Sequence, residues 1–269
     1  MRYPSVAGRF YPSNRPELKD LVEYCFEHPI GPGKVPDTGS ERSIRSIIVP
    51  HAGIAVSGPV AAHGYSELKK DGHRDAYIII GPDHYGQPFD VVTCSEPYVT
   101  PLGECKVSPL VGKFASYIPD SPNAHRYEHS IEVELPFLQY IDPDAEIVPI
   151  IMGRQDISTA RKLADIIRTV TEGKDVCVIA SSDLMHYVPD SVEKELDSMF
   201  IDKVLDRDIE GMYDTVMSKS MSVCGYGPMA TAILASEPKK SKLLCHSNSW
   251  ETIHYDKGSV VGYMSAIFR

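Results

Sequence analysis

The sequence lacks long apolar runs and has no excess of positive charge. No run of 18 or more apolar residues occurs, whereas a membrane helix needs about 20, so we expect no membrane partner. The 37 acidic residues outnumber the 27 basic ones, and the formal net charge is -10. A general nucleic-acid binder needs a basic face, so we expect no nucleic-acid partner. The N-terminal residues show no apolar signal segment, and we expect a cytoplasmic protein.

Several motifs of well-known sites are also missing. None of the six cysteines belongs to a C-x-x-C pair, which argues against a zinc ribbon, and we expect reduced, mostly buried thiols. The chain has no G-x-G-x-x-G after a strand and no G-x-x-x-x-G-K-[ST], so a nucleotide cofactor has no support. It has no G-x-S-x-G motif either, which argues against that design of serine hydrolase.

Short apolar segments alternate with amphipathic ones along the chain. We predict strands at Ser46–Val49, Ala76–Ile80, Val91–Cys94, Glu146–Ile151, Asp175–Ala180, near Leu243–Leu244 and at Ser259–Phe268. We predict helices at Ser57–Lys69, Ser130–Tyr140, Ser158–Val170, Val192–Leu205 and Tyr226–Ala235, with Ser57 as an N-cap. This alternation predicts an α/β fold with a largely parallel sheet covered on both faces. The linker-like stretch Pro29–Arg45 lies too near the N-terminus to separate two domains, so we expect one domain over residues 1–269.

Two predicted strands run directly into histidines. The first strand leads to His51 in "IIVPHAG", and the second leads through Gly81 and Pro82 to His84 in "IIIGPDH". In parallel α/β sheets, ligands bind beyond the carboxyl ends of the strands. We therefore predict that these two imidazoles form the floor of a binding site.

A third strand is followed by Asp183, with His186 three residues later. If Asp183 opens a turn or helix, this spacing puts both side chains on one face, where the carboxylate can orient the imidazole. The competing interpretation is that Ser181, Ser182 and Asp183 cap the following helix. We favour the site, because two other strands also end on histidines.

Two further clusters carry reactive side chains. Glu128 and His129 precede a strongly apolar predicted helix, in which Glu132 fits a capping box or a favourable helix-dipole position. Cys224 lies among glycines before the last predicted helix, and a thiol at a helix N-terminus tends to have a lowered pKa. The alternative for Cys224 is a thiol packed beneath a turn.

Two histidines and one anionic group suit a three-point metal site. With a carboxylate as the third ligand, the set is typical of non-haem Fe(II) and oxygen chemistry; with a thiolate, it suits copper or zinc. Asp183 and His186 would then support the ligands or act as an acid–base pair.

Six short blocks in this order resemble the Memo family, and the resemblance covers nearly the whole chain. They are "RYPSVAGRFYPS" at Arg2–Ser13, "PHAG" at Pro50–Gly53, "GPDH" at Gly81–His84, "EHSIE" at Glu128–Glu132, "SSD" and its following histidine at Ser181–His186, and "CG" with a Gly-Pro helix start at Cys224–Pro228. The resemblance implies a three-layer α/β/α sandwich similar to class III extradiol dioxygenases. It also implies the ligand set His51, His84 and Cys224, with Asp183 and His186 as catalytic residues beside it.

The resemblance further implies iron as the cofactor, with copper as an alternative, and a redox or oxidoreductase activity on an unidentified small-molecule or peptide ligand. Eukaryotic relatives are described as adaptors that bind phosphotyrosine peptides. A non-catalytic adaptor with a vestigial crevice is therefore a rival hypothesis, although few basic residues surround the two histidines. A zinc-dependent hydrolase, with Asp183 or Glu128 as base, is a third.

Overall fold

A computed structural model describes residues 1–269, and its centre is a ten-stranded sheet. The strands are β1 (Ser46–Val49), β2 (Ala76–Pro82), β3 (Val91–Thr93), β4 (Tyr98–Thr100), β5 (Gly103–Val107), β6 (Glu146–Met152), β7 (Val176–Ser181), β8 (His186–Val188), β9 (Ser241–Asn248) and β10 (Val260–Phe268). Their order is β4-β5-β6-β2-β7-β1-β10-β8, and β3 pairs with β6 while β9 pairs with β10.

The middle of the sheet is parallel, as the continuous apolar segments predict. Strands β6, β2, β7 and β1 all run in one direction, and β10 joins β1 in the antiparallel sense. Every residue of β2 is buried. A strand buried on both faces needs apolar side chains at every position rather than at every second one, and "AYIII" provides them.

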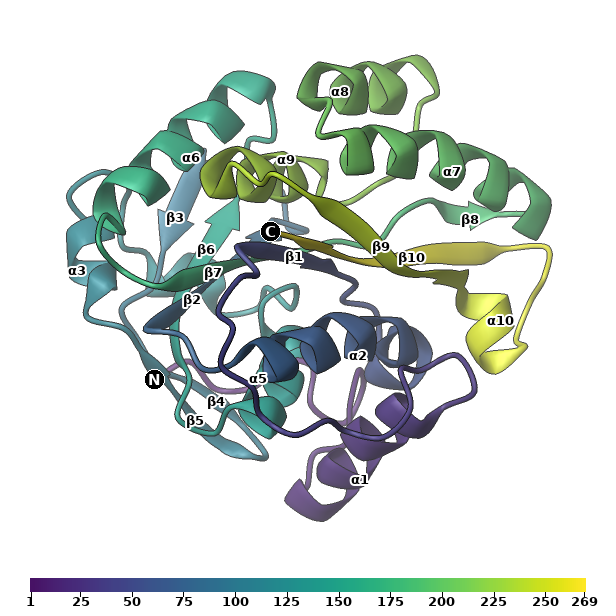
Figure 1. Ribbon diagram of the computed structural model, residues 1–269, viewed down its shortest axis with the longest axis horizontal. Coiled ribbons are helices and arrows are strands. Elements are labelled where there is room, and N and C mark those ends of the chain that lie inside the picture. Colours follow the sequence, from purple (N-terminus) through teal and green to yellow (C-terminus); the bar gives the residue numbers. More distant parts are fainter.

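Helices cover both faces of the sheet (Figure 1). They are α1 (Arg15–Glu27), α2 (Ile54–Asp71), α3 (Leu110–Phe114), α4 (Pro122–His125), a 3-10 turn (Glu132–Glu134), α5 (Leu135–Ile141), α6 (Ile157–Val170), α7 (Asp190–Asp206), α8 (Ile209–Ser218), α9 (Tyr226–Ser236) and α10 (Ser249–Ile253). Helices α1, α2 and α5 lie on one side, and α6 to α9 lie on the other.

Two separate apolar cores fill the spaces between the layers. Tyr77 and Ile79 of β2 point into the core beneath α1, α2 and α5, whereas Ile78 and Ile80 point into the core beneath α6 and α9. This alternation follows from the pleat of a strand. The three-layer α/β/α architecture is therefore confirmed.

Two local expectations and one competing interpretation were wrong. Helix α2 begins at Ile54, so Ser57 is not its cap; its hydroxyl donates to the carbonyl of Ala52 at 3.0 Å. The helix predicted at Ser130–Tyr140 is a 3-10 turn followed by α5. No helix follows Ser181–Asp183 directly, since β8 comes next and α7 begins only at Asp190.

The 18 residues of α2 contain polar and charged side chains, and no helix combines the length and apolar character needed to cross a bilayer. All six cysteines are free thiols, and four of them are buried.

Candidate metal centre

Three neighbouring parallel strands place their polar residues at one edge of the sheet. β1 is followed by His51, β2 by His84 and β7 by Asp183. Cys224 reaches the same place from the loop before α9. The loop can lie against the end of β7 because residue 225 is glycine: a Cβ there would be 2.6 Å from the carbonyl oxygen of Ser181.

His51, His84 and Cys224 come together as the sequence suggests. Each offers one ligand atom, and these atoms all lie within 4.8 Å of one another. Nε2 of His51 is 3.4 Å from Sγ of Cys224, and the two imidazole rings have centroids 5.2 Å apart. The geometry places two nitrogens and one sulfur around a common point.

A chain of hydrogen bonds fixes the orientation of His51. The Ser181 hydroxyl lies 2.7 Å from each of three atoms: Nδ1 of His51, Oε1 of Glu134 and the carbonyl oxygen of Ser130. A hydroxyl has one proton to donate. The assignment that satisfies all three contacts has Ser181 donating to the carbonyl and accepting from protonated Glu134 and from Nδ1–H of His51.

This assignment agrees with the titration of Glu134. Complete burial raises the pKa of Glu134 to about 8, and the Tyr65 hydroxyl donates to its other oxygen at 2.7 Å. Burial, together with the nearby imidazoles of His84 and His129, lowers the pKa of His51 well below its usual value. A neutral His51 with its proton on Nδ1 presents the lone pair of Nε2 to Cys224. Glu134 lies in the predicted helix, but nothing in the sequence pattern pointed to this role.

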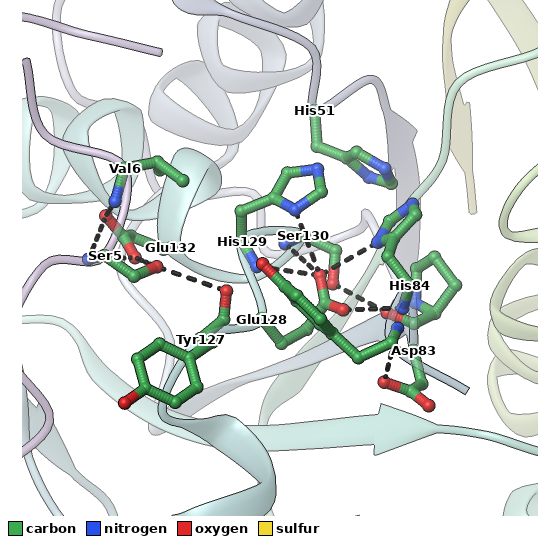
Figure 2. Close-up of polar contacts among 12 residues, drawn as sticks. Ser5, Val6, His51, Asp83, His84, Tyr127, Glu128, His129, Ser130 and Glu132 are labelled. Atoms are coloured by element: carbon green, nitrogen blue, oxygen red, sulfur yellow. Dashed lines mark hydrogen bonds and ion pairs between the residues drawn. The ribbon is translucent and has the colours of Figure 1, made fainter. Parts of the chain in front are cut away.

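Glu128 holds His84 in the corresponding way. Its carboxylate accepts from Nδ1–H of His84 at 2.9 Å and from three backbone amides, those of His84, His129 and Ser130 (Figure 2). Burial alone would raise the pKa of Glu128, but these hydrogen bonds outweigh it and lower the pKa to about 2. The bond to Glu128 leaves Nε2 as the unbonded ring nitrogen of His84.

His129 completes a cluster of three imidazoles. Its ring stacks on His84 with centroids 4.5 Å apart and meets His51 edge-on at 5.5 Å (Figure 2). Burial lowers the pKa of His129 to about 4, although Glu128 opposes the shift. The ring is therefore neutral near pH 7, so it adds no positive charge beside the ligands. Glu128 and His129 thus both contact His84, and His129 also meets His51.

Asp183 and His186 lie beside the centre but do not form the pair that their spacing suggested. The Asp183 carboxylate accepts from the backbone N–H groups of His51 and Ala52, at 2.9 and 3.3 Å. Nδ1 of His186 instead lies 2.9 Å from the carbonyl oxygen of Ser222. The idea that Asp183 orients His186 was wrong, because the chain enters β8 rather than a helical turn. Burial raises the pKa of Asp183.

Of the two interpretations of Cys224, the structure supports the packed thiol and not the thiol with a lowered pKa. Burial, reinforced by the charge of Asp183, raises the pKa of this thiol. The sulfur does accept a hydrogen bond from the backbone N–H of Asp183 at 3.2 Å. Without an ion the group is therefore a thiol, and a cation at the centre would favour the thiolate.

Glu132 neither caps a helix nor lies at the centre. Its carboxylate forms a buried ion pair with Arg2 and accepts from the backbone N–H groups of Ser5 and Val6. The Arg2 guanidinium also donates to the carbonyl oxygen of Glu128 at 2.6 Å. The N-terminal segment Arg2–Val6 is therefore bonded to the segment that carries Glu128 and His129.

These donors fit a transition-metal ion. Two imidazole nitrogens and one thiolate sulfur suit zinc, copper or iron, and each imidazole has an acceptor or hydroxyl on its Nδ1 that fixes the other nitrogen toward the centre. Such supporting contacts are typical of histidines that bind metals. The same edge of the sheet is where α/β proteins bind ligands.

Fold and site together define a three-layer α/β protein with a candidate metal centre at the carboxyl ends of its parallel strands. The family model described as "Memo-like protein" matches residues 2–267. The chain belongs to the Memo family.

Archaeal relatives match over their whole length. The chain is 41% identical to a MEMO1 family protein of Sulfurisphaera tokodaii, with 100% of this chain and 99% of that protein covered. It is 38% identical to one from Methanobrevibacter smithii, with both chains fully covered. It is 42% identical to one from Metallosphaera sedula, with 99% of each chain covered.

A solved structure shares the fold at low sequence identity. The crystal structure of the uncharacterized protein JW3007 from Escherichia coli K12 superposes with a TM-score of 0.53 and 12% identity. The match covers 84% of this chain and 100% of that one. The likeness supports the α/β architecture alone.

Proposed function

We propose that this Memo family protein binds a transition-metal ion, iron first and copper as the alternative, through His51, His84 and Cys224. The observation that carries the proposal is the convergence of three ligand atoms within 4.8 Å. Both imidazoles are held through Nδ1, by Ser181 and by Glu128. We further propose that the centre supports redox chemistry on an unidentified small-molecule or peptide ligand.

A bound iron or copper ion would supply a one-electron redox couple and open positions for a ligand. Two residues beside these ligands, Asp183 and His186, would support the centre. Asp183 holds the backbone of His51 and Ala52, and its N–H group faces the sulfur of Cys224. His186 is half-buried, and Ser222 occupies its Nδ1, so Nε2 is the nitrogen that can accept or donate a proton beside the centre.

The thiolate favours metal handling or one-electron chemistry over simple dioxygenase chemistry. Cysteine sulfur is readily oxidised when it is exposed to oxygen species as a thiolate. Glu128 does not replace Cys224 as a ligand, because its carboxylate is engaged by His84 and by three backbone amides.

A phosphopeptide adaptor finds less support in this crevice. Recognition of phosphate relies on arginine or lysine side chains with free donors. No lysine or arginine makes a hydrogen bond or ion pair with His51, His84 or Cys224. The guanidinium of Arg2 lies nearby, but it is buried and bonded to Glu132, to Ser5 and to backbone carbonyls.

Metal content is the first test. Protein purified without oxygen should contain near-stoichiometric iron or copper by mass spectrometry, and the His51→Ala and Cys224→Ser variants should lose it. His254→Ala and Cys245→Ser, which change an exposed histidine and a cysteine on β9, are matched controls that should retain it. No metal in the parent, even after reconstitution with Fe(II), Cu(I) and Zn(II), would refute the proposal. Zinc alone, with hydrolysis of an ester or amide, would favour the hydrolase instead.

A further inference from the structure

A second group of side chains that could hold a metal ion lies between α7 and the β9–β10 pair. Glu193 and Asp197 are one turn apart on α7, and His246 is on β9. One ligand atom from each lies within 4.8 Å of the other two. Helix α7 packs against both strands, as its position over β9 and β10 shows (Figure 1). None of these residues belongs to the centre of His51, His84 and Cys224.

The two carboxylates are unusual because both are completely buried. Glu193 and Asp197 are each 0% exposed, and the His246 side chain is 21% exposed. Buried carboxylates are rare unless they are paired or bind a metal. The only cationic partner here is His246, whose Nε2 lies 3.0 Å from Oε1 of Glu193 and 3.6 Å from Oδ2 of Asp197. One imidazolium balances only one of two ionised carboxylates, so the group needs either a bound proton or a second cation.

One oxygen of this group accepts no hydrogen bond, and its one polar contact is the 3.6 Å approach of Nε2 of His246. Oδ1 of Asp197 accepts from the backbone N–H of Met185 at 3.1 Å, but Oδ2 is buried and unsatisfied. Glu193 does accept a hydrogen bond on its second oxygen: the side-chain amide of Asn248 donates to Oε2 at 2.6 Å. An unsatisfied buried acceptor is costly and calls for an explanation such as an unseen ion.

A glycine on the facing strand lets these oxygens approach its backbone closely. His246 and Asn248 pair with Met264 and Gly262 across the β9–β10 ladder. A Cβ at Gly262 would overlap Oδ2 of Asp197 and lie 2.7 Å from Oε1 of Glu193. The free carboxylate oxygen therefore points at the one position of the facing strand that has no side chain.

We propose that Glu193, Asp197 and His246 bind a divalent cation of the Mn²⁺ or Zn²⁺ type, at a site distinct from His51, His84 and Cys224. Two carboxylate oxygens and one imidazole nitrogen are suitable ligands for these ions. The cation would give Oδ2 of Asp197 its missing partner and balance the buried negative charge.

The proposed site lies next to the segment that follows Asp183. Met185, whose N–H donates to Asp197, follows Asp183 by two residues, and the N–H of Leu184 donates to the carbonyl of Gly262 at 2.8 Å. A cation here would join α7 and β9 to the segment that leaves the first centre. It would act as a structural site, raising stability without touching a substrate.

The competing explanation is a proton held within the group. Burial, together with the neighbouring Glu193 carboxylate, raises the pKa of Asp197 to about 7. A protonated Asp197 would relieve the like-charge contact without any metal. In that case added cations have no effect, and Asp197→Asn leaves stability unchanged or increases it.

The test uses the full chain in a Cys224→Ser background, which removes the thiolate of the first centre. After chelator treatment, binding of Mn²⁺ is measured from the free-ion signal by electron paramagnetic resonance, and Zn²⁺ is added as a competitor. We expect one saturable Mn²⁺ site that Zn²⁺ displaces. Mn²⁺ should also raise the melting temperature by about 5 °C. His51 and His84 remain in this background, so loss of Mn²⁺ binding in a variant of the second group is what assigns the ion to that group.

Asp197→Asn should weaken Mn²⁺ binding by at least about tenfold and abolish the rise in melting temperature. The matched control is Glu195→Gln, an exposed carboxylate on the same helix, which should bind as the parent does. His246→Gln, at the half-exposed side of the group, serves if Asp197→Asn does not fold. The proposal is overturned if the parent binds no Mn²⁺, or if Asp197→Asn or His246→Gln binds it with unchanged affinity.

Discussion

The hydroxyl of Ser181 lies 2.7 Å from Nδ1 of His51, although 130 residues separate them in the sequence. β1 and β7 are neighbours in the sheet, with Val49 opposite Ser181, so the serine stands directly beside the loop that carries the histidine. Its position lets one side chain fix which nitrogen of His51 carries the proton.

Ser181→Ala should therefore weaken metal binding without removing a ligand. Loss of a hydrogen bond that supports a metal-binding histidine costs about 10- to 100-fold in affinity. Affinity is measured by competition with a chromogenic chelator on the reconstituted protein. Ser46→Ala is the control, because Ser46 is equally buried but lies at the opposite end of β1 and pairs with Ser236. Equal affinity for Ser181→Ala and the parent would contradict the assigned role.

Glu134 should make stability fall as pH rises. Burial raises its pKa from 4.5 to about 8 in the folded protein, so between these values the folded state holds a proton that the unfolded state has lost. The contribution of Glu134 to the free energy of unfolding is then complete below a pH equal to the lower pKa. It declines as the pH rises toward the upper pKa, by up to about 1.4 kcal/mol per pH unit. Tyr65 and Ser181 contact the carboxyl group, and the charge of Asp183 raises its pKa further.

Glu134→Gln removes this titration. In urea unfolding, the stability of the variant relative to the parent should improve by about 2 kcal/mol or more between about pH 5 and pH 8. Glu104→Gln, on the exposed side of β5, should leave the pH dependence of the parent unchanged. A constant difference between Glu134→Gln and the parent across this range would show that Glu134 does not hold a proton.

The sequence predicted the parts of the fold and site that depend on local pattern. Continuous apolar strands required a parallel sheet, and a parallel sheet brings the residues after its strands to one edge. His51 and His84 follow directly from that rule, and their strands end within two residues of the positions expected.

The parts that escaped prediction depend on contacts between distant segments. Ser181 meets Glu134 across 47 residues, and no periodicity shows that this glutamate is buried and protonated. The position of Cys224 before α9 left a reactive and a packed thiol as alternatives, and its burial, which raises the pKa of the thiol, depends on segments distant in the sequence. Asp183 and His186 have the spacing of a pair, yet each finds a better partner in another loop.

Arg2 should be important for stability although it is the second residue of the sequence. It is 3% exposed and forms a buried ion pair with Glu132, which is 0% exposed. Removing one partner of such a pair leaves an uncompensated buried charge and costs about 3 to 5 kcal/mol. Arg2→Ala should lower the free energy of unfolding by this amount in urea titrations at neutral pH.

Arg2→Lys and Arg9→Ala separate the causes of that loss. Lysine keeps the charge but cannot reach Glu132, Glu128 and His125 together as the guanidinium does, so its stability should fall between those of the parent and Arg2→Ala. Arg9 is exposed, and its replacement by alanine should change stability by less than about 0.5 kcal/mol. Equal stability of Arg2→Ala and Arg9→Ala would contradict this role of Arg2. The segment that carries Glu128 and His129, and with it the support of His84, would then be held by the backbone of that segment alone.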